Sequence, residues 1–265
     1  MKTIVITGST RGIGFALADE FLAQSCQVVV SGRTKLAVDQ ACKLLKGKHG
    51  KDHILGQVCN VTDFLSVQAL WDAAKAHFGK IDIWINNAGV GHAVRNVWEI
   101  EPEKMHAIIN TNVLGMLYGA KVAVNGFSDQ GFGAIYIMEG KGSDGKVQRG
   151  MTAYGTSKRA TNYLFNALEK ELEETPILVG SLSPGMVVTG LLDDQRQLGV
   201  EEWDRTKKIF NILGDKAETV SPWLTKRILA NQTTGATFRW LTGPRVLWRF
   251  LTARFIQRDL FRDEV

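Results

Sequence analysis

The sequence predicts a single α/β domain built on a doubly wound parallel sheet with helices on both faces. Short apolar runs rich in β-branched residues alternate along the chain with longer stretches of helical periodicity. The short runs are apolar throughout, which is typical of strands buried on both faces. Strands separated by helices of this length indicate right-handed βαβ crossovers. No internal repeat, low-complexity segment or Pro/Gly-rich linker divides the chain, so residues 1–265 are expected to form one domain.

The expected elements follow in order. Continuous β-branched runs predict strands at 3–7, 27–31, 53–58, 81–85, 133–138 and 177–183. Apolar residues at helical spacing predict helices at 12–24, 34–47, 63–78, 103–127, 152–174 and 216–230. Beyond the sixth strand, residues 190–230 are expected to form a helical lid over a substrate, and residues 236–265 a basic, aromatic tail.

Composition narrows the class of protein. An apolar content of 45% suffices for a large core. The three cysteines, Cys26, Cys42 and Cys59, lack metal-binding spacing, so we expect buried thiols in a reducing compartment and no metal site. No apolar run reaches the roughly 18–20 residues that span a bilayer, and the first strand starts too early for a signal or transit segment. We therefore expect a cytoplasmic protein. The net charge of +5 suits an anionic cofactor, and no nucleic-acid partner is expected.

A glycine-rich turn follows the first strand. The sequence "TGSTRGIG" places Gly8, Gly12 and Gly14 where the strand turns into a helix. Glycines there permit a tight turn and let the helix N-terminus face a pyrophosphate. The spacing differs from the G-x-G-x-x-G of many dinucleotide sites, so taken alone the segment could be a tight turn only.

The end of the second strand indicates which dinucleotide would bind. In "VVVSGRTK", Arg33 stands where an NAD site would carry an Asp or Glu for the ribose 2′-hydroxyl. A guanidinium can bind a 2′-phosphate, with Arg11 of the glycine turn as a second cation. The alternative is a pair of solvated surface arginines. The sequence favours NADPH (NADP+) as cofactor.

A tyrosine and a lysine one helical turn apart form the candidate catalytic pair. Tyr154 and Lys158 share one face of the helix expected at 152–174. A phenol is a weak acid at neutral pH, and an adjacent ammonium is expected to lower the pKa of Tyr154 toward the working range. Such a pair alone is often surface decoration. Here it follows the glycine turn, "NNAG" at 86–89 and "NTNVLG" at 110–115.

These motifs, in this order, resemble the short-chain dehydrogenase/reductase family across nearly residues 1–190. The resemblance rests on "TGSTRGIG", "NNAG", Asn112, "YGTSK" and "SPGMVVT". It implies a Rossmann-like fold in which Tyr154 protonates a carbonyl oxygen, Lys158 binds the nicotinamide ribose and Asn112 holds a water for a proton relay. It also implies a cofactor site made of Gly8, Ser9, Thr10, Arg11, Gly12, Ile13, Gly14, Arg33, Asn60, Val61, Asn87, Ala88, Gly89, Tyr154, Lys158, Pro184, Gly185, Val187 and Thr189. Asn60 departs from the family's usual Asp beside the adenine.

The family's catalytic serine has no clear counterpart. It usually stands 12 to 14 residues before the tyrosine, and this chain has Gly140, Lys141 and Gly142 there, preceded by Glu139. The nearest hydroxyl is Ser143, 11 residues before Tyr154. The Gly-rich loop "EGKGSDG" could curl this side chain toward a substrate. Alternatively, Ser143 only forms a turn with Asp144 and Gly145.

A narrower resemblance covers the C-terminal half. The segments "GSDG", "AYGTSKRA", "SLSPGMVVTGLL", "FNILGDKAETV" and "RFLTARFIQRDLF" are similar to the chlorophyll b reductases of that family. This resemblance implies NADPH-dependent reduction of the 7-formyl group of chlorophyll(ide) b to a hydroxymethyl group. A lipophilic pigment-like carbonyl substrate and a homo-oligomer are accordingly expected as partners. The candidate lid carries Trp203, Phe210 and Leu213, with Trp223 following; they could stack on a conjugated ring or pack a small helical subdomain.

Two other functions stay open on the sequence. One is an NADPH-dependent carbonyl reductase for another lipophilic aldehyde or ketone, and the other is a non-catalytic NADPH-binding protein. The tail is expected to form an amphipathic helix over 245–262 that contacts a membrane surface or packs on the core or a neighbouring subunit. Its apolar residues are Leu247, Trp248, Leu251, Phe255 and Ile256, and its cations are Arg245, Arg249, Arg254, Arg258 and Arg262.

Overall fold

The computed structural model describes residues 1–197 and 199–262. In this part of the chain the main sheet has seven parallel strands in the order β3-β2-β1-β4-β5-β6-β9. Its strands are β1 (Thr3–Ile6), β2 (Gln27–Gly32), β3 (Ile54–Val58), β4 (Ile83–Asn86), β5 (Gly133–Met138), β6 (Ile177–Ser183) and β9 (Ala236–Arg239). The first six are the strands that the sequence predicts, within two residues at each end. The doubly wound, Rossmann-like fold class is confirmed.

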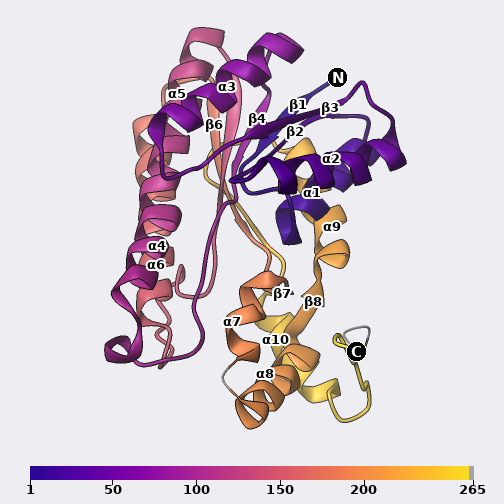
Figure 1. Cartoon of the computed structure of the whole chain (residues 1–265), viewed down its shortest axis with the longest axis vertical. Helices are drawn as coiled ribbons and strands as arrows, with labels where there is room; N and C mark the ends of the chain where they lie inside the picture. The colour runs from indigo at the N-terminus through magenta and orange to yellow at the C-terminus, as the bar shows by residue number, and fades with distance from the viewer. Residues whose placement is uncertain (198, 263–265) are drawn as a thin grey trace.

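Helices cover both faces of the sheet (Figure 1). The larger helices are α1 (Gly12–Ala23), α2 (Lys35–His49), α3 (Phe64–Phe78), α4 (Pro102–Ile109), α5 (Gly115–Gln130), α6 (Thr152–Glu171) and α9 (Ala217–Ala230). Helices α1 and α9 pack together on one face, and α3 packs on α5 on the other. The helices expected near 12–24, 34–47, 63–78, 152–174 and 216–230 are thus confirmed.

Alternate residues of each strand supply the two cores. On β1, Ile4 and Ile6 enter the core beneath α1, α2 and α9, while Val5 enters the core beneath α3, α5 and α6. Period-two alternation places neighbouring side chains on opposite faces. Because both faces are covered, the strands read as unbroken apolar runs.

The helix expected at 103–127 is interrupted at its middle. Residues Asn110–Leu114 form a π-helical turn, η2, between α4 and α5. The continuous stretch Pro102–Gln130 is long and apolar enough to cross a membrane by length and composition. Here its buried side packs on α3, α6 and the sheet, so we describe it as a core helix.

The segment after β6 builds a small layer beneath the carboxyl ends of the strands. It contains β7 (Met186–Val188), η3 (Gly190–Leu192), α7 (Asp193–Arg196), α8 (Val200–Leu213), β8 (Gly214–Lys216) and α10 (Gly243–Thr252). Strands β7 and β8 pair with each other in parallel, and α8 packs on α10. Figure 1 shows α7, α8 and α10 at the bottom of the molecule, away from β1, α3 and α5.

The tail differs from its prediction. Helix α10 ends at Thr252, whereas a helix to residue 262 is expected from the sequence. Beyond it the chain turns back, so that Arg258 reaches Asp215 and Phe261 contacts Trp203. These contacts hold the end of the tail on α8 and β8, and a straight helix could not make them. Residues 198 and 263–265 of the expected lid and tail lie outside the described residues.

Candidate active site

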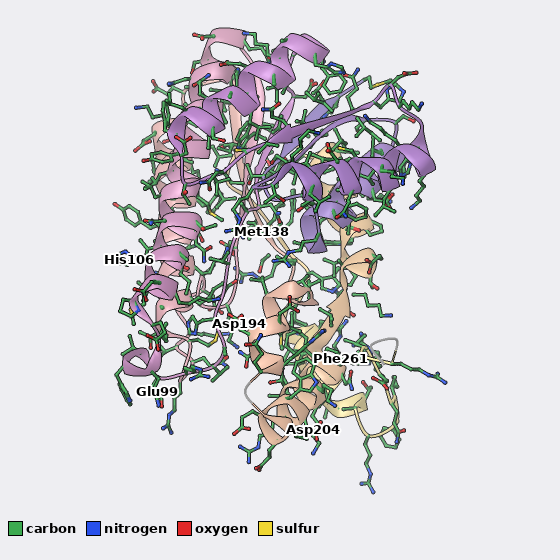
Figure 2. All side chains as sticks on the ribbon, in the orientation of Figure 1. Glu99, His106, Met138, Asp194, Asp204 and Phe261 are labelled. Carbon is green, nitrogen blue, oxygen red and sulfur yellow. The ribbon has the colours of Figure 1, made fainter. Side chains whose placement is uncertain are left out.

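The predicted site residues gather where the strands end. Loops after β1, β4, β5 and β6 carry the glycine turn, "NNAG", the "EGKGSDG" loop and "SPGMVVT". In open α/β sheets this edge is where ligands bind. Figure 2 places Met138, the last residue of β5, at the centre of the molecule, with Asp194 of α7 below it.

The glycine turn fits a dinucleotide. Gly8 and Gly12 have positive φ angles of 64° and 58°, and a Cβ on Gly14 would lie 2.6 Å from the Gly8 carbonyl oxygen. Only glycine permits this close turn at the start of α1. The side chain of the N-cap residue, Arg11, makes no capping hydrogen bond to the first amides of α1, so these amides can face an anion. The buried Asn87 Oδ1 beside this turn has no hydrogen-bond partner among the described residues.

Thr7, which the sequence analysis missed, holds "NNAG" against this turn. Its hydroxyl oxygen accepts hydrogen bonds from the backbone amides of Asn87 (2.9 Å) and Ala88 (3.0 Å). Asn87 Nδ2 in turn donates to the carbonyl oxygens of Thr7 and Gly8. A threonine directly before the glycine turn is the signal that could have identified it.

The two arginines proposed for the 2′-phosphate differ in their surroundings. Arg33 is exposed at the end of β2, and no ion pair or hydrogen bond holds its side chain within the described part of the chain. A Cβ on the adjacent Gly32 would lie 2.6 Å from Thr10 Cγ2. The end of β2, which carries Arg33, therefore lies directly beside the glycine turn. Arg11 instead forms a long, exposed ion pair of 3.9 Å with Asp193 of α7. Arg33 is therefore better placed than Arg11 to bind a 2′-phosphate.

Asn60 and Thr189 are both tied to the turns that follow them. Asn60 Oδ1 accepts hydrogen bonds from the backbone amide and hydroxyl of Thr62. Thr189 caps η3 by accepting from the Leu191 amide at 3.4 Å. A Cβ on Gly12 would lie 3.2 Å from Thr189 Cγ2, so the segment after β7 lies directly against the glycine turn.

Tyr154 and Lys158 face one another on α6. Lys158 is buried, its Nζ donates to the Met138 carbonyl oxygen (3.1 Å) and lies 5.8 Å from the centroid of the Tyr154 ring. Burial lowers the pKa of Lys158 to about 8, although the buried carboxylate of Glu139 opposes the shift. The expected lowering of the tyrosine pKa is wrong here, because burial raises the pKa of Tyr154 to about 12. The phenol therefore keeps its proton at neutral pH, as a proton donor must.

Asn112 occupies the π-helical turn and ties three segments together. Its Oδ1 accepts from the Val90 amide at 2.8 Å, and its Nδ2 donates to the Val90 carbonyl oxygen and to Ser157 Oγ, both at 2.9 Å. Single π turns often mark functional sites. Asn112 thus joins the "NNAG" segment to α6 one residue before Lys158. Ser157 is part of the "YGTSK" motif, and this position could have identified it. The sequence analysis nevertheless gave Ser157 no role.

His92 is a second residue that the sequence analysis missed. It is buried, and its Nε2 accepts a hydrogen bond of 3.2 Å from the backbone amide of Tyr154. This assignment places the ring proton on Nδ1, which donates to the Ala93 carbonyl oxygen at 2.6 Å. His92 therefore positions the first turn of α6. No sequence motif marks it.

The side chain of Ser143 makes hydrogen bonds that hold its own loop against α6. Its buried hydroxyl donates to the Lys158 carbonyl oxygen (3.1 Å) and accepts from the Gly140 amide (3.1 Å). Gly140, three residues earlier, is the residue whose Cα faces the Tyr154 hydroxyl. The geometry favours the alternative that Ser143 shapes the turn, and its role as a second donor to substrate stays a prediction.

Two carboxylates of α7 connect the expected lid to the rest of the site. Asp194 accepts a hydrogen bond of 2.5 Å from Lys104 of α4, and Asp193 pairs with Arg11 of the glycine turn. Next to α7, Leu191 lies 3.4 Å from where a Cβ on Gly91 would sit. The segment 190–196 thus borders the cofactor turn and the Tyr154 side of the site, as a lid would.

The aromatic residues expected to stack on a substrate pack on protein instead. Trp203 and Phe210 make edge-to-face contacts with Phe261, and Trp223 makes one with Trp240. These contacts favour the alternative, packing within a small helical subdomain, for Trp203 and Phe210, whereas Trp223 of α9 packs on the main core. The described residues contain no cluster of three or more His, Cys, Asp or Glu suited to a metal ion, and all three cysteines are free and buried.

The glycine turn, the buried Lys158 and the neighbouring Tyr154 fit the class of protein to which the comparisons assign this chain. It is an NAD(P)H-dependent oxidoreductase with a nicotinamide cofactor. The family model for short chain dehydrogenases matches residues 2–198, and the chain belongs to this family.

Two curated relatives and one solved structure illustrate the likeness. The chloroplastic chlorophyll(ide) b reductase NOL of Oryza sativa subsp. japonica is 37% identical over 258 residues, covering 94% of this chain and 74% of the relative. Its counterpart in Arabidopsis thaliana is 35% identical, covering 91% and 70%. The 3-ketoacyl-(acyl-carrier-protein) reductase from Brucella melitensis, complexed with NADH, matches with a TM-score of 0.79 at 23% identity, covering 92% of this chain and 98% of that one. The last comparison supports the fold alone.

Proposed function

We propose that this chain reduces the 7-formyl group of chlorophyll(ide) b to a hydroxymethyl group with NADPH. The observation that carries the proposal is the similarity to chlorophyll(ide) b reductases, which at 37% identity covers 94% of the chain. In the structure the "EGKGSDG" loop puts Gly140, without a side chain, against the Tyr154 hydroxyl. A side chain at this position would displace Tyr154, so the glycine keeps the candidate proton donor in place for the formyl group.

The residues have distinct roles in this proposal. NADPH, when bound, would supply the hydride for the formyl carbon. Tyr154 donates its phenolic proton to the formyl oxygen as charge develops there, so one hydride and one proton convert the aldehyde into the alcohol. The Lys158 ammonium binds the nicotinamide ribose and favours the phenolate that forms. The proton is then restored to Tyr154 from solvent, through a water that we expect near Asn112.

The cofactor residues follow the sequence predictions. The glycine turn would hold the pyrophosphate, Arg33 the 2′-phosphate, and residues 184–189 the nicotinamide. The geometry of Gly8, Gly12 and Gly14 supports the first assignment, and the exposed, unpaired Arg33 supports the second. Assembly into a homo-oligomer and a cytoplasmic location stay predictions.

Product identification tests the proposal. The protein is incubated with chlorophyll b or chlorophyllide b and NADPH, and the pigment is analysed by chromatography and mass spectrometry, with Tyr154→Phe as the control. We expect a 7-hydroxymethyl product from the wild type and nearly none from the variant. Reduction of other lipophilic aldehydes, with the pigment left intact, would favour a general carbonyl reductase. NADPH binding without oxidation by any carbonyl compound would favour a non-catalytic protein.

A further inference from the structure

The C-terminal segment presents a row of large apolar side chains to solvent. An ordinary amphipathic helix turns its apolar side toward the core. Helix α10 and the residues after it do the opposite, and the large side chains are 47% to 83% exposed. We call this set the outward apolar face: Leu247, Trp248, Phe250, Leu251, Phe255 and Ile256.

Arginines on the opposite side of α10, together with Arg258 in the chain after the helix, fix this orientation. Arg249 donates to Asp215 Oδ2 at 2.7 Å, and Arg258 donates to Asp215 Oδ1 at 2.7 Å. The Asp215 side chain is only 4% exposed, so the carboxylate needs both cations. Arg245 lies 4.1 Å above the Trp240 ring and also bonds the Trp240 carbonyl oxygen. These contacts hold the cationic side of the helix on the protein, which leaves the apolar side outward.

The charge of the segment indicates what covers this face. Residues 236–265 contain six arginines and three acidic residues. Arg254 and Arg262 are exposed beside or beyond the outward apolar face and have no ion pair or hydrogen bond in the described part of the chain. A second copy of the chain would bring like charges together. An anionic lipid surface offers an apolar interior to the large side chains and opposite charge to the exposed arginines.

We propose that the outward apolar face inserts into the interface of an anionic lipid bilayer, with Arg254 and Arg262 at the headgroups. Tryptophan and phenylalanine side chains are well suited to the boundary between headgroups and acyl chains. The Asp215 ion pairs keep the helix fixed on the protein, so the whole domain would be oriented on the membrane. This inference stands on the geometry of the tail and does not require the proposed substrate.

Vesicle flotation of the full chain tests the proposal. The vesicles contain phosphatidylglycerol and phosphatidylcholine, or phosphatidylcholine alone. We expect binding to the anionic vesicles that weakens with added salt. The double variant Leu247→Ser, Leu251→Ser should bind about tenfold less tightly or worse. Arg254→Gln should weaken binding to anionic vesicles only.

A matched control is available in Trp98, which is 80% exposed on the distant helix η1 (Val97–Glu99). Trp98→Ser should bind vesicles like the wild type. All variants should keep the melting temperature, because the changed side chains are exposed. Truncation before α10 is a poor test, because it would leave Asp215 buried without Arg249 and Arg258.

Two outcomes would overturn the proposal. One is a wild type that stays in the vesicle-free fraction, or a double variant that binds as well as the wild type. The other is a wild-type oligomer that the double variant dissociates in analytical ultracentrifugation, without vesicle binding by either protein. That second result would make the outward apolar face a contact between copies of this chain.

Discussion

A Cβ built on Gly140 would lie 2.5 Å from the hydroxyl oxygen of Tyr154 and 3.0 Å from Lys158 Cε. The first distance is shorter than real Cβ contacts and the second is tighter than most of them, so a side chain at 140 would have to displace the candidate proton donor. The sequence offers no hydroxyl at 140–142, where the family's serine is expected. The absence of a side chain at Gly140 is therefore part of how Tyr154 is positioned.

Gly140→Ala should lower carbonyl reduction by about 10²-fold, because a displacement of the reacting group by about 1 Å has an effect of that size. NADPH binding, measured by fluorescence titration, should change little. Gly47→Ala on α2 is the control, since a Cβ there meets no atom within 4 Å and its rate should equal that of the wild type. A fully active Gly140→Ala enzyme would show that Tyr154 can move without loss.

Ser143→Ala should lower the free energy of unfolding by about 1–3 kcal/mol, because the Gly140 amide and the Lys158 carbonyl oxygen lose a buried partner. Urea denaturation measures this change. Activity should fall only to the extent that the loop loosens. A rate loss of about 10²–10³-fold with unchanged stability would instead establish Ser143 as a second donor to the carbonyl oxygen.

The rate of reduction should fall as pH rises above about 8. A lysine keeps its proton below its pKa and loses it above, and burial lowers the pKa of Lys158 to about 8. Tyr154, with a pKa raised to about 12, stays protonated over this range. The pH profile of kcat/KM reports such groups in the free enzyme.

Glu139→Gln extends this prediction, because the Glu139 carboxylate favours the charged form of Lys158. Its loss should move the alkaline limb of the profile to lower pH. The control is Glu171→Gln on the exposed part of α6, which should leave the profile unchanged. If both profiles match the wild type, another group sets the alkaline limb.

Strands were predictable where both of their faces are buried, because such strands are apolar at every position. The first six strands follow this rule. Strand β9 was missed because its residues alternate between half-buried and exposed at the edge of the sheet. The π-helical turn at Asn112 has no distinct periodicity, so the sequence could not separate α4 from α5.

The candidate site was predictable where residues form a local motif, and not where they meet through the fold. Tyr154 and Lys158 are one helical turn apart. His92 reaches Tyr154 from 62 residues away, and Asp215 meets Arg249 across 34 residues. Such contacts depend on the tertiary structure. They also explain why the tail turns back after Thr252.

The last prediction concerns the choice of cofactor. Arg33 is exposed at the end of β2, next to Gly32 and Thr10, where a carboxylate would repel a 2′-phosphate. A charge-assisted hydrogen bond contributes about 1.5–3 kcal/mol. Arg33→Asp should therefore raise the KM for NADPH by roughly 10- to 100-fold and change the KM for NADH little. Steady-state kinetics with a single carbonyl substrate measures both constants. Lys43→Asp on the exposed side of α2 makes the same change in net charge and should affect neither cofactor. An equal rise in both constants for Arg33→Asp would mean that Arg33 supports the turn and does not read the phosphate.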